Sequence, residues 1–133
     1  TAPIYRVGIN NASPATALDV NGNVRFIGTV TSTPVYVSNV IDYFSGGLLT
    51  HKYLIFTGGA SQAISILPQG LNGQELVIIC KGALLSIRDD NNIVLSNLDS
   101  QVDLLGGNVN SSITLVYLAD IDGGIWQEVN RNP

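Results

Sequence analysis

Residues 64–80 read ISILPQGLNGQELVIIC, in which two short apolar runs flank an Asn-Gly pair. Asn72-Gly73 predicts a tight turn, because asparagine tolerates positive φ and glycine adopts it without steric cost. The first run alternates Ile64 and Ile66 with a serine, as a half-buried strand does. The second run, Leu76 to Cys80, is apolar throughout, which is typical of a strand covered on both faces. This stretch indicates strands that reverse over a tight turn and bury a shared core.

Turn-forming residues recur along the rest of the chain. Gly, Pro, Asn and Asp interrupt it about every 8–12 residues, the spacing of short strands joined by turns. Asn21-Gly22 and Asp122-Gly123 repeat the tight-turn signal. Strands are expected near residues 54–56, 64–67, 76–80, 84–87, 93–95, 102–105, 113–118 and 125–129. The pattern predicts an all-β chain whose C-terminal domain, residues 45–133, is a β-sandwich or jelly-roll-like unit.

The first part of the chain, residues 1–44, has a different texture. Its apolar runs, such as Ile4-Tyr5 or Leu18 and Val20, are too short to enclose a core. A segment of this kind has to pack on the rest of the chain or on identical chains beside it. We expect a self-associating segment here, joined to the C-terminal domain by a hinge at Ser45-Gly46-Gly47.

The composition points the same way. Charged residues make up 12% of the 133 residues and hydrophobic residues 45%, whereas an ordinary soluble domain has about 25% charged residues. A small monomer with so few charges has difficulty covering its surface with polar groups. Self-association, together with a surface rich in uncharged polar residues, resolves that difficulty.

Several classes of function are disfavoured. The six basic residues are scattered and the net charge is −4, so no nucleic-acid partner is expected. No apolar run approaches the ~20 residues of a membrane-spanning helix, so no membrane insertion is expected. The single cysteine, Cys80, is interpreted as a small buried hydrophobic residue, since a nucleophile would need a nearby base. We expect no cofactor and no bound metal.

The N-terminal segment resembles a known family of proteins. Residues 7–25, VGINNASPATALDVNGNVR, are similar to the VGIGT-x-SP-x-x-x-LDVNGN-(V/I)-R element of bacteriophage tail fibres. Asn10-Asn11 replaces the usual Gly-Thr pair, a departure that affects one turn. Near the other end, Ser112 to Tyr117 and Ile125 to Arg131 resemble the TLIYDG…W-x-E-(I/V)-x-R ending of fibre tips.

The resemblance implies an architecture and a role. Residues 1–44 would form an interlaced, β-prism-like shaft segment of a parallel homotrimer, and residues 45–133 a β-sandwich tip. The implied function is attachment of a virion to a host-cell receptor, expected to be a glycan, by an extracellular fibre that also contacts other fibre or baseplate proteins. The structural alternative is a fibre or capsid-decoration module, or the fibre of a phage-derived contractile injection system, with recognition elsewhere.

Receptor contacts are expected from aromatic and polar side chains, because sugars stack on flat apolar faces and hydrogen-bond to Asn and Asp. The candidates are Trp126, Tyr117, Asp89, Asp90, Asn91, Asn92, Asp120 and Asp122. An alternative for Trp126 is packing in a core or interface. Residues 120–123 resemble part of a calcium loop but lack its closing glutamate, so a hairpin turn joining Tyr117 to Trp126 is favoured.

The carboxylates offer an enzymatic alternative. A glycan depolymerase needs two carboxyl groups about 5–9 Å apart across a sugar. The available pairs are Asp89 with Asp90, Asp99 with Asp103, and Asp120 with Asp122. Each lies beside Asn, Gly or Ser, which is the composition of a turn, so the prediction is that the chain is not an enzyme.

Overall fold

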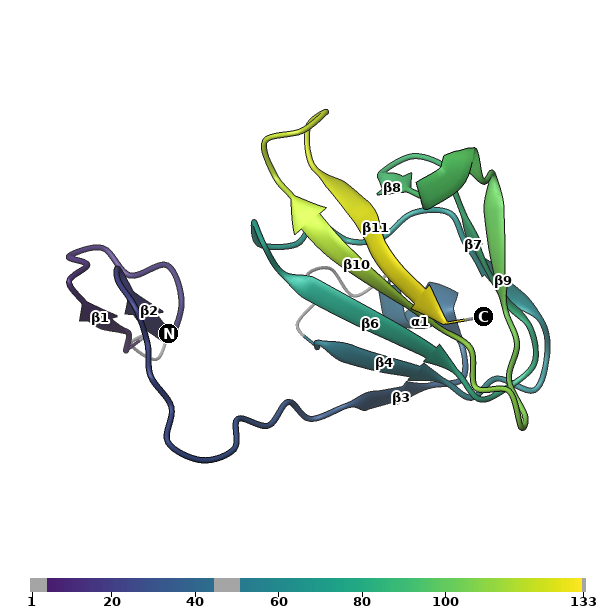
Figure 1. Ribbon diagram of the computed structural model, residues 1–133, viewed down its shortest axis with the longest axis horizontal. Helices are drawn as coiled ribbons and strands as arrows, with labels where there is room; N and C mark the ends of the chain where they lie inside the picture. The colour runs from purple at the N-terminus through teal and green to yellow at the C-terminus, as the bar shows by residue number, and fades with distance from the viewer. Residues whose placement is uncertain (1–4, 45–50, 133) are drawn as a thin grey trace. The chain divides into compact units, whose positions relative to one another are not determined.

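The computed structural model describes residues 5–44 and 51–132, and the chain divides into two units, Thr1–Thr31 and Ser32–Pro133. Strand is the main element in both units (Figure 1). The helical segments described are a single short α-helix, α1 (Val40–Phe44), and one 3-10 turn, η1 (Ser96–Leu98). The all-β prediction is therefore confirmed. The predicted hinge at residues 45–47 lies outside the described residues.

The N-terminal unit contains a small parallel sheet. Its strands are β1 (Val7–Ile9) and β2 (Leu18–Val20), with Val7 opposite Leu18 and Ile9 opposite Val20. The backbone pairing extends by one bond at each end, from the Val7 amide to Ala17 and from the Asn21 amide to Ile9. Two strands of this length are marginal by themselves in water. The unit thus depends on something beyond its own pairing.

The second unit has a six-stranded and a three-stranded sheet. The first has the order β3-β4-β6-β10-β11-β8 and the second the order β5-β7-β9 (Figure 1). The strands are β3 (Val35–Val37), β4 (Tyr53–Phe56), β5 (Gln62–Ile64), β6 (Glu75–Cys80), β7 (Leu85–Arg88), β8 (Ile93–Val94), β9 (Gln101–Leu104), β10 (Ser112–Leu118) and β11 (Ile125–Asn132). Every strand expected beyond residue 50 overlaps one of these. The Asn72-Gly73 turn lies just before β6 as predicted.

Between β4 and β7 the chain winds from one sheet to the other and back, so that strands paired in the same sheet run parallel. We call this path the parallel coil. The chain passes from β4 to β5, back to β6 and on to β7, and β4 pairs parallel to β6 while β5 pairs parallel to β7. A jelly roll is built from antiparallel Greek keys, so this part of the sequence prediction is wrong. Turn dipeptides report a local reversal of the chain, but they carry no signal for the direction of a distant partner strand.

Three glycines stack where successive passes of the coil turn. Gly58, Gly82 and Gly106 recur at equal intervals, each two residues after a buried apolar residue. A Cβ at Gly82 would overlap the Gly58 carbonyl oxygen, and a Cβ at Gly106 would overlap that of Gly82. The amide of Ala83 donates to the Gly58 carbonyl at 2.8 Å, which ties neighbouring turns together. Only glycine allows the backbones to approach this closely.

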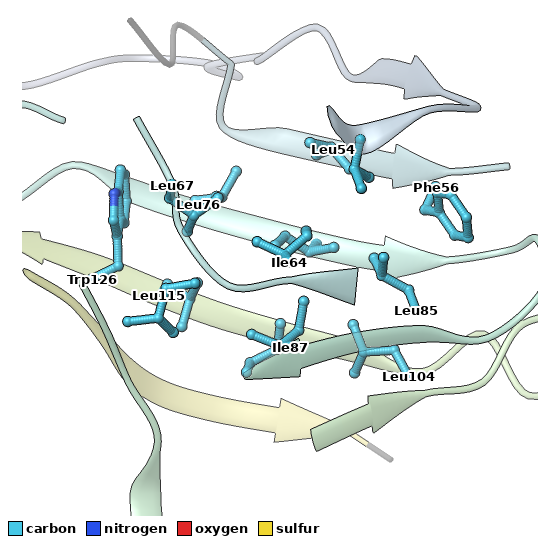
Figure 2. Packing of buried hydrophobic residues seen from close by; sticks show 14 of the residues in the cluster. Leu54, Phe56, Ile64, Leu67, Leu76, Leu85, Ile87, Leu104, Leu115 and Trp126 are labelled. Carbon is cyan, nitrogen blue, oxygen red and sulfur yellow. The ribbon is translucent and has the colours of Figure 1, made fainter. Parts of the chain in front are cut away.

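The core lies between the two sheets. Leu76 and Leu115 of the six-stranded sheet face Ile64 and Ile87 of the three-stranded sheet, and all four are buried (Figure 2). Along β6 and β10, buried residues alternate with half-buried or exposed ones, so each strand turns one face to the core. Burying a side chain of this size stabilises the fold by about 1.5–3 kcal/mol. The second unit therefore has a complete core of its own.

The boundary between the units differs from the predicted one. The chain divides after Thr31, not after residue 44. Strand β3 pairs parallel to β4, and Val37 and Val40 belong to the buried core. The side-chain carboxamide oxygen of Gln62 accepts the Val40 amide at 2.9 Å. Residues 35–44 contain no long apolar run. Their sequence therefore does not indicate that their few apolar residues complete the core of the second unit.

Candidate interaction surfaces

One face of the N-terminal sheet is apolar and open. Val7, Ile9, Leu18 and Val20 are paired in register and project from the same side of β1 and β2. The first three are each more than half exposed. Within residues 5–31 no residue at all is buried. We call these four side chains the β1–β2 face.

The opposite face of this sheet is covered by its own loop. A Cβ on Gly8 would overlap the Asn11 carbonyl oxygen, so glycine is required for the loop to lie across the strand. The loop is held by hydrogen bonds from the Ala15 amide to Asp19 Oδ2 at 2.8 Å and from Arg6 Nη1 to the Pro14 carbonyl at 3.1 Å. One face is thus closed by polar contacts, which leaves the apolar β1–β2 face as the open one.

The two aromatic candidates for receptor binding are in the core. Trp126 is fully buried and Tyr117 is 2% exposed. Their rings pack against each other with centroids 5.2 Å apart, and the indole Nε1 donates to the Pro68 carbonyl at 2.9 Å. Neither ring presents a face on which a sugar could stack. The prediction that Trp126 and Tyr117 contact a receptor is therefore wrong, and the core-packing alternative for Trp126 is confirmed.

Residues 89–92 form a tight, internally bonded turn. Asp89 Oδ2 accepts the Leu95 amide and Asp90 Oδ1 accepts the Asn91 amide. Asn91 has φ of 50° and donates from Nδ2 to the Ser65 carbonyl. Asn92 pairs with the Leu67 backbone in both directions, at 3.0 and 2.7 Å. The carboxylates stay exposed at this turn, whereas the Asn92 amide serves to join two turns of the coil.

Asp120 and Asp122 lie in the turn of a β-hairpin. Strands β10 and β11 pair antiparallel with Tyr117 opposite Trp126, so the predicted hairpin is confirmed. Asp122 adopts φ of 47° and is followed by Gly123 at 79°, the conformation that Asp-Gly pairs favour. Both aspartates are exposed. Among residues 5–44 and 51–132, no three His, Cys, Asp or Glu side chains gather as metal ligands would.

The structure brings these polar turns to one end of the second unit. The Trp126 amide donates to the Asn92 carbonyl at 2.6 Å, which links the 89–92 turn to the start of β11. The Ala119 amide donates to Asn72 Oδ1 at 3.0 Å, which links the hairpin to the turn before β6. We call the turns at residues 68–73, 89–92 and 119–124 the loop end. It carries the exposed Asp89, Asp90, Asn91, Asp120 and Asp122.

A second polar loop, at residues 96–99, presents a leucine that was not among the expected contact residues. Asn97 and Leu98 have φ of 61° and 60°, and Leu98 is fully exposed at 101%. A left-handed conformation is strained for a bulky residue such as leucine. The isolated Leu98 lies between Asn and Asp in the sequence, and a leucine at that place carries no signal for a left-handed backbone.

This loop is held by an ionic cluster at its base. Arg131 contacts Asp99 Oδ2 at 2.8 Å and engages both oxygens of the buried Glu128. The same Glu128 accepts the Ser96 amide at 2.7 Å. The hydrogen bonds to Glu128 raise the pKa of Arg131 above its ordinary value, so the guanidinium stays charged. The cluster fixes the loop that presents Leu98.

Asp99 and Asp103 each have structural partners, and the Cys80 thiol is buried. Asp99 pairs with Arg131, and Asp103 accepts from Ser86 Oγ at 2.6 Å and from Gln101 Nε2 at 2.7 Å. Cys80 is fully buried, and burial raises the pKa of its thiol. A thiol of this kind is a poor nucleophile, and the interpretation of Cys80 as a buried hydrophobic residue is confirmed.

Comparison with known proteins adds no assignment: no family model matches the chain, and no curated protein or solved structure matches it either. Within residues 5–44 and 51–132, no helix has the length and apolar character needed to cross a membrane. The geometry of the two units and the sequence element at residues 7–25 are therefore the basis for a functional proposal.

Proposed function

We propose that this chain is the distal part of a homotrimeric, phage-type tail fibre that attaches a virion to a host-cell receptor, expected to be a glycan. In this proposal the N-terminal unit joins the copies, and the loop end of the second unit contacts the receptor. The fibre acts outside the cell as part of the virion and is connected to other fibre or baseplate proteins. No catalytic turnover is part of the proposal.

The observation that carries the proposal is the exposure of the β1–β2 face. Apolar surface left in water forgoes about 25 cal/mol of stabilisation per Å². The described residues of this unit contain nothing that covers these side chains. Parallel copies of the same segment would supply matching apolar faces in register. The similarity of residues 7–25 to the tail-fibre element supports the same arrangement.

The loop end supports a role in attachment. It presents several carboxylates and an asparagine amide on turns whose backbone is held by hydrogen bonds to the body of the unit. Polar groups on a rigid base lose little conformational entropy when they bind. Three copies on one fibre would add weak contacts through multivalency.

The test is labelling of a panel of bacterial strains with the full chain. The informative variant is Asp120→Ala at the loop end, and the matched control is Lys81→Ala, at the opposite end of β6. We expect labelled strains to lose most of the signal with Asp120→Ala and to keep it with Lys81→Ala. Equal labelling by both variants would contradict attachment through the loop end.

The purely structural role is the second candidate. It is favoured by the burial of Trp126 and Tyr117, which removes the aromatic platforms that glycan recognition commonly uses. Under this alternative the chain assembles into a fibre or decorates one, and recognition resides elsewhere. An assembled chain that labels no strain of the panel at micromolar concentration would establish this alternative over attachment.

A further inference from the structure

The two outward faces of the second unit differ in character. On the three-stranded sheet, the outward residues Ser86, Gln101 and Asp103 form a hydrogen-bonded polar group, with exposed Arg88 beside it. On the six-stranded sheet, the outward residues are those that alternate with buried core residues, such as Val77 between Leu76 and Ile78. We call these the polar face and the apolar face.

The apolar face extends over β3, β4, β6 and β10, and on β11 it gives way to the polar Gln127 and Asn130, which pair with Val116 and Thr114. The strand register sets Tyr36 beside Ile55 and Ile79 in one row. The next row runs from Tyr53 through Val77 to Thr114. Val116 extends the face on β10, and Tyr36 is more than half exposed. The sequence of β6 is that of a strand covered on both faces, yet in the described chain only the inward face of β6 is fully buried.

The apolar face is also free of charge at its centre. Among the outward strand residues of this sheet in the described chain, Glu75 is the charged one, and it lies at the first position of β6. Its carboxylate is paired with Lys52 at 3.3 Å. Equivalent residues of a symmetric oligomer approach one another near the axis, so a charged face would bring like charges together. Asp103 and Arg88 would do so on the polar face, whereas Thr114 and Val77 would not.

We infer that the apolar face of the six-stranded sheet packs around the symmetry axis against the same sheet of neighbouring copies of this chain. The inference rests on the proposed homotrimer and adds a second interface to it, on a unit that already has its own core. Thr114, at the middle of β10, then lies close to its equivalents in the other copies. The polar face remains in solvent.

The test is site-specific cross-linking of the full chain. Cys80 is buried and is the single natural cysteine, so an introduced cysteine provides the reactive thiol. Thr114→Cys places it at the centre of the apolar face, and Val77→Cys repeats the test on the neighbouring strand. Gln101→Cys is the matched control on the polar face. Each variant is treated with a short bis-maleimide, run on a denaturing gel, and its mass in solution is measured by sedimentation.

We expect Thr114→Cys and Val77→Cys to shift to twice the single-chain mass on the gel and Gln101→Cys to stay at the single-chain mass. Cross-linking at Gln101 alone would overturn the inference. A multimeric solution mass without cross-links at Thr114 or Val77 would also overturn it, while leaving the proposed fibre in place. A single-chain mass in solution for the unmodified protein would remove both.

Discussion

The two units of this chain differ in the burial of their apolar side chains. In residues 5–31 the apolar side chains of β1 and β2 lie on one face that nothing in the unit covers, whereas Leu76, Leu115 and their neighbours in the second unit are fully buried. The difference follows from the number of layers. A single two-stranded sheet has no second layer to pack on, while two sheets enclose a core between them. The first unit therefore lacks a core within its described residues, whereas the second unit has one.

The largest effect is expected from a charge on the β1–β2 face. Leu18→Asp would place a carboxylate among the apolar side chains of associated copies, and burying an unpaired charge costs several kcal/mol. We expect this variant to dissociate towards the single 14.1 kDa chain at protein concentrations where the unmodified chain stays associated, since only the interface of the second unit remains. The control is Asn23→Asp, an equal charge change at an exposed site outside β1 and β2. If Leu18→Asp assembles as the unmodified chain does, the face has no role in association.

Truncating a buried side chain of the second unit should lower its stability, whereas truncating an exposed one should not. Leu85 is fully buried, whereas Leu71 is 59% exposed. Leu85→Ala is expected to lower the free energy of unfolding by about 2–5 kcal/mol, because it removes buried contacts and leaves a cavity. Leu71→Ala is expected to change it by less than about 0.5 kcal/mol. Denaturant unfolding followed by Trp126 fluorescence measures both, and similar losses would mean that the core is misplaced.

Next in size is the ionic cluster at the base of the Leu98 loop. Glu128→Gln leaves Arg131 without its buried carboxylate partner and should cost about 1.5–3 kcal/mol in unfolding free energy. The exposed pair of Lys52 and Glu75 is the comparison, and Glu75→Gln should cost no more than about 1 kcal/mol, since solvent-exposed pairs contribute little. Thermal unfolding of both variants checks the order, and an equal loss would contradict the assigned burial of Glu128.

The smallest effect is expected at the stacked glycines. Gly82→Ala would press a methyl group against the Gly58 carbonyl, and overpacking of this kind costs about 1–3 kcal/mol. Gly59→Ala is the matched control, because a Cβ there meets no atom within 4 Å. We expect a lower unfolding temperature for Gly82→Ala alone. Equal stability of the two variants would show that successive turns of the coil do not touch at this point.

Much of the fold could be predicted from residue patterns because strand and turn signals are local. Val, Ile and Leu runs bounded by Asn-Gly or Asp-Gly located β6, β10 and the β10–β11 hairpin. The short apolar runs of residues 1–44 indicated a segment without a core, and the structure limits that segment to the unit that ends at Thr31. The candidate site was harder to predict. The pattern that identified Asp120 and Asp122 as turn residues was local. The burial of Trp126, by contrast, depends on strands far away in the chain.

The amino-acid sequence by itself determined that the chain is β-structured, where most strands lie, and that its first part cannot enclose a core. Only the tertiary structure decided that β4 to β7 wind as a parallel coil, that Trp126 and Tyr117 are core residues, and that β3 belongs to the second unit. The physical reason is that strand formation depends on neighbours within a few residues, whereas pairing direction and burial depend on contacts between residues far apart in the chain.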